Sequence, residues 1–313
     1  MTQLFQKEYM KIEGEWLTIT VPASCNGKRL DYLVKEEWPL SKQLVKMLIR
    51  EEGIKLNGKK ATIQQTVTTN DCVQLHLLLE EENDVLSNEH IKNFSICYED
   101  DFLLVVNKGA GLDVHPNEPN ERQTLANGIA AYYQKTNQRH KVRHVHRLDR
   151  DTTGLVLFAK DPFTQSLLDE QLRLRFIHRQ YYALVHGKMK KEKGIIDQPI
   201  GKDRHHPNRR VISKKGARAI TEYDVVETYR KASMVKAILQ TGRTHQIRVH
   251  FQSIGHPLIG DPLYGKKSPL RFTRQALHAK KLTFTHPFTL EQMTVECEFP
   301  TDFRKLKEQV KQA

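Results

Sequence analysis

Apolar and polar residues alternate along the chain with two different periods, and each period predicts one kind of element. Val45, Leu48 and Ile49 recur at helical spacing and predict a helix with one apolar face. Ser41 is a suitable N-cap for this helix, and Gly53 is a suitable residue to end it. The letters that follow, IKLNGKK, predict a strand and a turn.

Strand patterns dominate the longer second part of the chain. The segment GLVLFAK is apolar almost throughout and predicts a strand that is buried on both faces. Asp161 and Pro162 suit the N-cap and first position of one helix, and Thr244 suits the N-cap of another. Strands outnumber helices and their order is irregular. We therefore expect an α+β fold with a mixed, largely antiparallel sheet and flanking helices, preceded by a small α/β domain.

A polar stretch that is poor in bulky residues, Glu80–Asn93, divides the chain. This composition is typical of a linker between domains. The sequence therefore predicts four parts: an N-terminal extension (residues 1–16), a small domain (17–79), a linker (80–93) and a larger domain (94–313).

Composition narrows the class of protein. The chain has 313 residues, of which 38% are hydrophobic, so we expect a folded protein with two domains. Lys and Arg total 50 against 37 acids, and this net charge of +13 favours a polyanionic partner such as nucleic acid. No apolar run approaches the length that spans a bilayer, and the first residues lack the apolar core of a signal peptide. We therefore expect no membrane partner and a cytoplasmic location.

Cysteine usage argues against a disulfide framework or a zinc knot. The four cysteines are far apart and form no CxxC pair. Each is expected to be a small buried residue.

One short stretch, HVHRLDRDTTG, concentrates charge in front of the apolar strand. Asp149 lies between Arg147 and Arg150, and two neighbouring cations favour the ionised carboxylate. Such a group can act as a nucleophile, as a base, or as one end of a structural ion pair. Asp151 lies in a sequence suited to a turn, where its side chain is expected to bond the local backbone. Asp149 is therefore the better candidate for chemistry.

Further polar residues could complete a site. Arg248 follows an apolar position on a predicted helix and needs a carboxylate partner, for which Asp149 is a candidate. Tyr181 and Tyr182 face opposite sides of a predicted strand, so one of them faces inward, either toward a pocket or into the core.

The histidines allow a different interpretation. His144 and His146 would share one face of a strand and could bind a metal, but no Cys or carboxylate at ligand spacing accompanies them in this segment. A metal-dependent nuclease is therefore a weaker alternative. The loop Arg204–Arg210, which contains Arg209, is rich in Arg and His and is expected to contact RNA phosphates.

In the first part of the chain, Lys42, Lys46 and Arg50 are spaced by four and form a basic stripe on the predicted helix. The stripe is either an RNA-binding surface or the solvated face of an ordinary amphipathic helix. This part resembles the S4-type RNA-binding module, and the resemblance rests on RLDYLV, PLSKQLVKMLI and GIKLNGKKA. The Pro-Gly-Asp turn that usually ends the module is replaced here by TTND, which keeps only the acid.

The second part resembles the RluA-type family of RNA pseudouridine synthases over most of residues 96–300. Five segments in the family's order carry the resemblance: VVNKGAGLDVHP, HRLDRDTTGLVLFAK, RQYYALVHG, TGRTHQIRVHFQSIGHPLIGDPLYG and RQALHAKKLTFTHP. The resemblance implies the pseudouridine synthase fold and the isomerisation of uridine in RNA. An S4-type module in front of this domain is a common arrangement in the family.

The resemblance also implies a role for each matching residue. Asp149 corresponds to the essential aspartate, Tyr181 to the tyrosine that packs on the target base, and Arg248 to the arginine that pairs with the aspartate. Arg147 corresponds to an arginine that helps to displace the target nucleotide. Whether the aspartate attacks C1′ or removes the C2′ proton stays open.

Departures from the family pattern are few. Gly109 stands where proline is usual and is expected to loosen its loop. Thr153 replaces a frequent serine, and Arg179 replaces a frequent lysine. These two replacements preserve the chemical type.

An isomerisation requires no redox cofactor or energy donor, so we expect no cofactor and no metal. The expected partner is RNA, above all large-subunit ribosomal RNA, and the expected state is a monomer. Two alternatives stay open beside the nuclease: a synthase that modifies transfer RNA, and a non-catalytic RNA-binding or ribosome-assembly factor.

Overall fold

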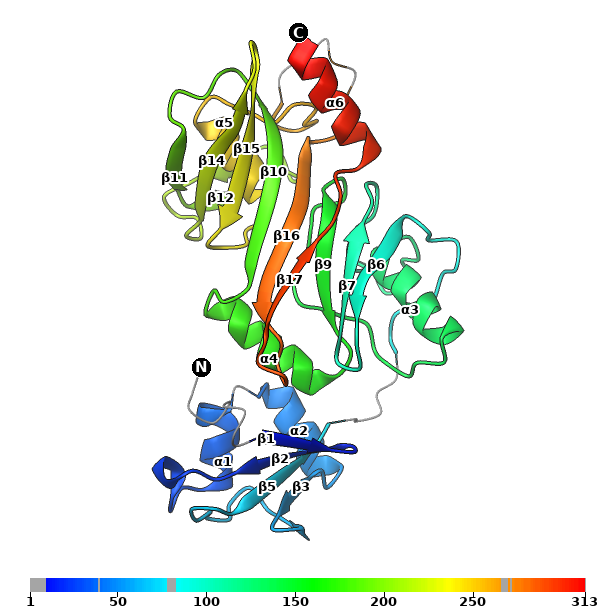
Figure 1. The fold of residues 1–313 in the computed structure, drawn as a ribbon, viewed down its shortest axis with the longest axis vertical. Helices are drawn as coiled ribbons and strands as arrows, with labels where there is room; N and C mark the ends of the chain where they lie inside the picture. The colour runs from blue at the N-terminus through cyan, green and yellow to red at the C-terminus, as the bar shows by residue number, and fades with distance from the viewer. Residues whose placement is uncertain (1–9, 39, 78–82, 266–269, 271, 313) are drawn as a thin grey trace.

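Two domains follow one another along the chain in the computed structural model, which describes residues 10–38, 40–77, 83–265, 270 and 272–312 (Figure 1). The first domain is an antiparallel sheet with the strand order β1-β2-β5-β3-β4. Its strands are β1 (Met10–Glu13), β2 (Trp16–Thr20), β3 (Ile54–Leu56), β4 (Lys59–Lys60) and β5 (Cys72–His76). Its helical segments are η2 (Ala23–Cys25), α1 (Leu30–Tyr32), η3 (Leu33–Glu37) and α2 (Lys42–Arg50).

The N-terminal boundary of this domain differs from the prediction. Residues 1–16 were expected to form an extension, but Met10–Glu13 pair with Trp16–Ile19 as the edge strand of the sheet. Residues 1–9 lie outside the described residues. Met10 and Ile12 are half-buried and alternate with the exposed Lys11 and Glu13, so the strand pattern was present in the sequence but short.

Helix α2 forms as its cap predicts, because the Ser41 hydroxyl accepts a hydrogen bond from the Leu44 amide at 3.1 Å. Two details of the prediction are wrong. Ile49 was assigned to the apolar face but is 47% exposed. The residue with left-handed backbone after the helix is Glu52, with φ 54°, and not Gly53. The buried face is centred one position away from the predicted one and comprises Leu44, Val45, Met47 and Leu48.

A single large sheet organises the second domain, with the order β11-β14-β15-β10-β16-β9-β7-β6, and with β17 paired to β16 and β8 paired to β9. Among the named strands only β9 and β16 pair in parallel, so the predicted mixed, largely antiparallel sheet is confirmed. The strands are β6 (Phe94–Glu99), β7 (Leu103–Lys108), β8 (Arg143–His144), β9 (Thr153–Ala159), β10 (His178–His186), β11 (Lys193–Asp197), β14 (Ile220–Thr228), β15 (Ala232–Leu239), β16 (Leu277–Thr285) and β17 (Gln292–Glu296). A small hairpin, β12 (Ile200–Lys202) with β13 (Arg210–Ile212), lies beside this sheet.

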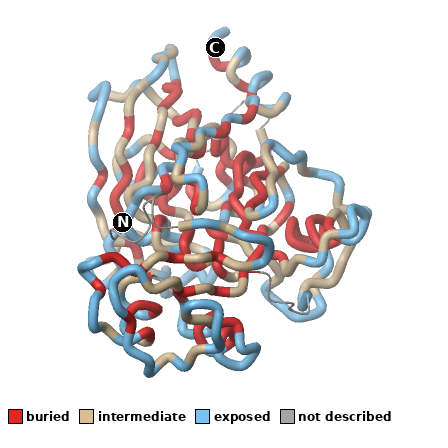
Figure 2. The backbone as a smooth tube through the Cα atoms, turned by 60° about the horizontal axis from the view of Figure 1, so that its bottom comes forward, coloured by how far each residue is buried: buried red, intermediate tan, exposed pale blue. Residues whose placement is uncertain are grey.

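Helices cover both faces of the sheet, as the predicted α+β fold requires. Helices α3 (Leu125–Lys135) and α5 (Gln246–Ser253) pack on one face, and α4 (Pro162–Arg173) and α6 (Thr301–Gln312) pack on the other. Every residue of β9 is buried, as its apolar sequence predicts, and Figure 2 shows buried residues running along the central strands. The cap of α4 is also as predicted, because the Asp161 carboxylate accepts from two amides of its first turn.

The predicted linker does not behave as one over the residues that the structure describes. Asn88 donates its amide to Asn127 of α3, and Asn127 in turn donates to the Leu86 carbonyl. Asn93 donates its side-chain amide to the carbonyl of Ala110 at 2.7 Å. Residues 86–93 are therefore part of the second domain, because their polar groups find partners there; residues 80–82 lie outside the described residues.

The two domains share one apolar contact surface at helix α4. Phe163 and Leu167 of α4 belong to the same buried cluster as the core of the first domain. The Ser166 hydroxyl, between them in sequence, accepts a hydrogen bond from the Ser41 amide at 3.2 Å. Figure 1 shows α2 lying against α4. The first domain is therefore packed on the second, and its position is set by a buried contact.

Truncation of Phe163 tests this docking. Both tryptophans of the chain, Trp16 and Trp38, belong to the first domain, so their fluorescence reports its unfolding. Phe163→Ala should destabilise this transition in urea by about 3–5 kcal/mol, because it opens a cavity in the shared core. Leu168→Ala is the control, since Leu168 lies on the same helix but packs within the second domain. An equal shift of the tryptophan signal in both variants would contradict the shared core.

Candidate active site

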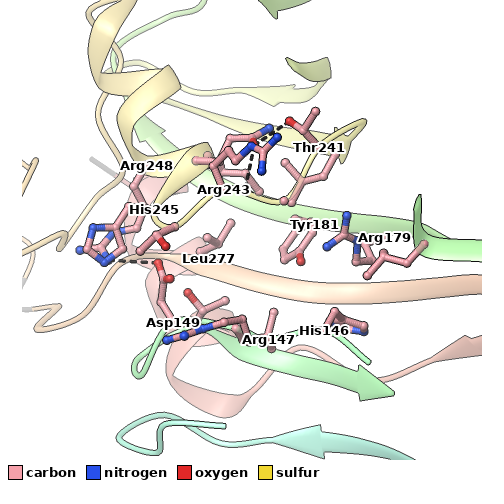
Figure 3. A pocket seen from close by; sticks show the side chains of 18 of the residues that line it. His146, Arg147, Asp149, Arg179, Tyr181, Thr241, Arg243, His245, Arg248 and Leu277 are labelled. Atoms are coloured by element: carbon pink, nitrogen blue, oxygen red, sulfur yellow. Dashed lines mark hydrogen bonds and ion pairs between the residues drawn. The ribbon is translucent and has the colours of Figure 1, made fainter. Parts of the chain in front are cut away.

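A cavity of about 370 Å³ opens between the turn that precedes β9, strand β10 and the loop that precedes α5. This volume lies in the usual range of ligand sites. Figure 3 shows its side chains, which include Asp149, Tyr181 and Arg248. The structure thus brings together in one cavity the three residues that the sequence predicted as catalytic. Also at the cavity are Arg147, His146, Arg179, Arg243 and Leu277.

The turn that carries Asp149 is held by its own backbone and by side chains of the segment before β16. The Asp149 carbonyl accepts from the Thr152 amide at 3.0 Å, which closes the turn. Arg274 donates to the Asp151 carbonyl at 3.2 Å, and Gln275 donates to the Thr152 hydroxyl at 3.0 Å. The turn is therefore fixed by side chains from the segment before β16.

Lys108, at the end of β7, fastens the same turn from the other side. It is fully buried, and its Nζ donates to the carbonyls of Gly109, Leu112 and Arg150 at 2.8–2.9 Å. Burial lowers its pKa to about 7, although the neighbouring aspartates raise it. Three carbonyl acceptors match the three donors of an ammonium group. Lys108 was not among the predicted site residues; a lysine in the apolar strand LLVVNK was the available signal.

Asp151 does contribute to the turn region, but its partner is not local. It was expected to bond its own backbone, whereas its carboxylate accepts from the Gly111 amide at 3.1 Å. The β7 side of the sheet brings this amide close, which the sequence of the turn does not reveal. Asp151 therefore ties the loop after β7 to the turn of Asp149.

The loop after β7 is tighter than the sequence suggested. Gly109 was expected to loosen it, but its amide donates to the Asn93 carbonyl at 2.8 Å. A Cβ at position 109 would lie 2.0 Å from Asn93 Oδ1. Because the Asn93 side chain fills that space and bonds Ala110, the glycine accommodates a close contact.

Arg248, from α5, connects two aspartates. Its Nε and Nη2 donate to Asp261 at 2.7 and 2.9 Å, and its Nη1 donates to Asp149 at 3.1 Å. The predicted contact between Arg248 and Asp149 is therefore present in the structure. Asp261 is the residue that the sequence analysis missed, although its motif, GDPLYG, was part of the resemblance.

Asp261 fixes the position of the arginine. Its side chain is fully buried, and Oδ1 also accepts from the amides of Leu263 and Tyr264. Burial alone would lower the pKa of Arg248, but the hydrogen bonds and charges of Asp261 and Asp149 raise it above its usual value. Because two of its five donors are committed to Asp261 in a fork, the Arg248 guanidinium presents a fixed N–H to Asp149.

The start of α5 corrects one prediction. Thr244 was expected to cap this helix, but the residue before its first turn is His245, with left-handed φ of 60° and no side-chain cap. The Gln246 side chain instead holds the loop in front of the helix, because it accepts from the Thr241 hydroxyl and the Arg243 amide. His245 also contacts the Tyr264 hydroxyl at 2.9 Å, so tertiary contacts stabilise a conformation that local sequence disfavours.

Tyr181 faces the cavity and Tyr182 the opposite side, as the strand alternation predicts. Tyr181 is 3% exposed, and burial raises its pKa. Tyr182 packs edge-on against Phe299 on the far face of the sheet. An aromatic ring at the cavity wall offers a stacking surface to a planar ligand.

The predicted RNA-binding residues occupy three separate places. Arg147 is exposed at the cavity. Arg209 is partly buried, with its guanidinium carbon 5.4 Å from the centre of the Tyr264 ring. The stripe residues lie on the exposed face of α2 in the first domain, where Arg50 also pairs with Glu51. None of the three stripe residues, Lys42, Lys46 and Arg50, is among the residues that line the cavity.

The histidines do not assemble a metal-binding cluster in the described part of the chain, where no group of three or more His, Cys, Asp or Glu side chains has suitable placement. His144 instead packs on the ring of His115, and burial lowers its pKa to about 4.

The four cysteines are unpaired; Cys25 and Cys297 are buried as predicted, whereas Cys72 is partly exposed and Cys97 is exposed. No helix within the described residues is long and apolar enough to cross a membrane.

Comparison with known proteins agrees with the geometry. Residues 102–253 match the model of the RNA pseudouridylate synthase family, and residues 17–73 match that of the RluD ribosomal pseudouridine synthase N-terminal domain. An uncharacterized RNA pseudouridine synthase of Bacillus subtilis (strain 168), YhcT, is 40% identical over 95% of this chain and 98% of its own length. The ribosomal large subunit pseudouridine synthase D of Nitrosomonas europaea is 36% identical over 94% of this chain and 88% of its own length.

Solved structures show the same fold. The human RNA pseudouridylate synthase domain containing 1 protein superposes with a TM-score of 0.57 at 26% identity, covering 69% of this chain and 87% of its own. The human domain containing 4 protein gives a TM-score of 0.59 at 23% identity, covering 69% of this chain and 92% of its own. The second likeness is evidence of fold alone.

Asp261→Asn tests the buried pair. It keeps the size of the side chain but removes the charge that Arg248 needs, so it should cost about 3–5 kcal/mol of stability. The control is Asp302→Asn, because Asp302 binds Arg274 through the same two atoms but is half exposed. Calorimetry should show a clearly larger fall in Tm for Asp261→Asn, and equal falls would argue against it.

Proposed function

Because this chain belongs to the family of RNA pseudouridine synthases and is an enzyme of that class, we propose that it modifies uridines of large-subunit ribosomal RNA through Asp149, Tyr181 and Arg248. The observation that carries the residue assignment is the ion pair of Asp149 with Arg248 at the wall of a nucleotide-sized cavity. The names of the relatives support the choice of RNA, since several act on the ribosomal large subunit.

Asp149 is the carboxylate that reacts. Its side chain is 20% exposed toward the cavity, whereas Asp261 is fully buried and Asp151 is engaged by the Gly111 amide. The reaction breaks the bond between ribose C1′ and uracil N1, rotates the ring, and joins C5 to C1′. One carboxylate is sufficient for this, as nucleophile at C1′ or as base at C2′. A second carboxylate, as a hydrolase uses to activate water, is not needed.

Arg248 orients the carboxylate. Its Nη1 binds one oxygen of Asp149, Oδ2, and leaves the other to face the substrate. Because Asp261 holds the guanidinium, the carboxylate does not need to reorganise as the reaction proceeds. Arg248 and Asp261 thus act through Asp149 as positioning residues.

Tyr181 holds the uracil. Its ring forms part of the cavity wall on the same strand face as the apolar core, so the ring has little freedom to move. A detached base must stay in place while it rotates, and stacking on an aromatic ring supplies this without fixing one orientation. Water exclusion is served by apolar side chains of the same wall, among them Leu277 and Ile247.

The target uridine must leave the base stack of the RNA before it can enter the cavity. This costs a few kcal/mol, which contacts to the backbone must offset. Arg147 is exposed at the cavity and is placed to displace the nucleotide. Arg209 and the α2 stripe are the further places where we expect contacts to RNA phosphates, away from the cavity.

The proposed function is tested by mapping pseudouridine in all RNA of a strain that lacks the gene, against its parent. We expect sites in large-subunit ribosomal RNA to disappear and to return when the wild-type gene is restored. With RNA from the deletion strain that carries tritium at C5 of uridine, purified enzyme should release tritium. Asp149→Asn should reduce release by more than a thousandfold with RNA binding retained. Loss confined to transfer RNA would contradict the ribosomal target, and activity of Asp149→Asn would remove this residue from its role.

The α2 stripe gives a second prediction. Charge reversal of Lys42, Lys46 and Arg50 should weaken RNA binding and lower the slope of log Kd against log salt by about 0.7–0.9 for each phosphate that the protein no longer neutralises. The matched control reverses Arg304, Lys305 and Lys311 of α6, which packs on the face of the sheet opposite Tyr181. An unchanged slope in the stripe variant would show that the stripe is an ordinary solvated helix face.

A further inference from the structure

Two buried hydrogen-bond donors in the cavity have no partner within the described residues. Arg179 is 9% exposed and its Nε makes no hydrogen bond; His146 is 6% exposed and its Nδ1 makes none. Both line the same cavity as Asp149. Buried polar groups normally have hydrogen-bond partners, so two buried donors without a partner in one cavity indicate that a ligand binds there.

His146 is a donor at Nδ1. Its Nε2 accepts a hydrogen bond from the Leu157 amide at 3.3 Å, so the proton of the neutral ring lies on Nδ1. Burial, and then the charge of Arg179, lower the pKa of His146 well below its usual value, which keeps the ring neutral. The ring therefore offers one fixed N–H.

Arg179 is placed beside Tyr181 by the alternation of β10. The two residues are two apart on one strand, and both are buried on the same face. A Cβ at Gly242 would lie 3.0 Å from Nη1 of Arg179, so a glycine there leaves room for the guanidinium. No acidic side chain among the described residues pairs with Arg179, and a buried cation without a partner costs stability. An unpaired buried cation is typical of an active site, where it can stabilise negative charge that develops on the substrate during the reaction.

The positions of these donors indicate which atoms of the substrate they meet. Figure 3 shows Arg179 and His146 on the side of Tyr181 away from Asp149. With the ribose at Asp149 and the uracil on Tyr181, the side of the ring away from N1, which bears O4, points toward Arg179 and His146. When the ring turns to present C5 to C1′, O2 takes the place of O4.

We propose that Arg179 and His146 bind the uracil oxygens and stabilise the negative charge of the detached ring, an inference that rests on the proposed function. When C1′–N1 breaks, the bonding electron pair stays on N1 and is delocalised onto the two carbonyl oxygens. The ribose is left as an ester of Asp149, or loses its C2′ proton to it. After rotation, C5 bonds to C1′; on the first route this displaces the Asp149 carboxylate from the ester, and on the second C2′ takes its proton back from Asp149. The proton on C5 is then released, and N1 takes a proton. Atoms and electrons balance without a co-reactant.

A phosphate of the RNA backbone is the other anion that Arg179 could meet. The ring edge is favoured because the two donors lie beyond Tyr181 from Asp149, and because a neutral His146 donor suits a carbonyl oxygen. The two sources differ in what they predict: a leaving-group contact acts on kcat, and a phosphate contact acts on KM and on its salt dependence.

The test uses Arg179→Met, Arg179→Lys and, as a control, Arg173→Gln, since Arg173 is exposed on α4 and pairs there with Glu170. On deletion-strain ribosomal RNA tritiated at C5 of uridine, Arg179→Met should lower kcat by about 100-fold or more with KM little changed, as for loss of one oxyanion donor. Arg179→Lys should recover most of kcat, and Arg173→Gln should retain it. Arg179→Met should have a Tm at least equal to that of the wild type, because it removes a buried unpaired cation.

RNA with 5-fluorouridine in place of uridine gives the decisive comparison. Fluorine stabilises the uracil anion, so the fold reduction in rate that Arg179→Met causes should be at least tenfold smaller on this RNA. The rate is measured as loss of 5-fluorouridine in nuclease digests by mass spectrometry. An equal deficit on both RNAs would overturn the leaving-group role. A rise in KM with unchanged kcat and a flatter salt dependence would assign Arg179 to a phosphate instead, and a fall in Tm would make it structural.

Failure of the two proposals is distinguishable. A wild-type enzyme that releases no tritium from any RNA would refute the proposed function, and the inference with it. An active wild type together with an equally active Arg179→Met refutes the inference alone.

Discussion

The site depends on one buried chain of charges, in which Asp261 holds Arg248 and Arg248 holds Asp149. A buried arginine requires a carboxylate, and a fork of two hydrogen bonds fixes its plane. Asp261 also accepts hydrogen bonds from backbone amides of its own loop, and these bonds fix the series of charges to the backbone. The Asp149 carboxylate, which we propose to react, is thereby oriented by a residue whose side chain is fully buried.

The backbone beneath Asp149 is as constrained as its side chain. Lys108, buried at the end of β7, and Arg274, from the segment before β16, each bind a carbonyl of the turn. Gly154 allows β9 and β16 to approach, since a Cβ there would lie 2.2 Å from the Ala279 carbonyl. Strands on both sides of β9 thus fix the turn, and the cost of burying these cations is offset by carbonyl and carboxylate partners.

The same principle separates Arg179 from the other buried cations. Lys108, Arg248 and Arg274 are paired with protein groups, whereas Arg179 faces the cavity without an acid among the described residues. Among these four buried cations, the one that lacks a protein partner is the one where substrate charge is expected. The docked first domain adds a basic surface at a set position, because its core includes Phe163 of α4.

Local sequence determined the features that depend on near neighbours. The caps at Ser41 and Asp161 and the fully buried strand β9 follow from spacing and side-chain chemistry, and the motif resemblance identified the family and is the source of the proposal for Asp149. Tertiary structure alone decided the remaining partners. Asp261 holds Arg248, Asp151 accepts from the Gly111 amide, and the cap expected at Thr244 gave way to a left-handed His245 that contacts Tyr264. The physical reason is that propensity acts within a few residues, whereas burial pairs charges wherever the sheet brings them together.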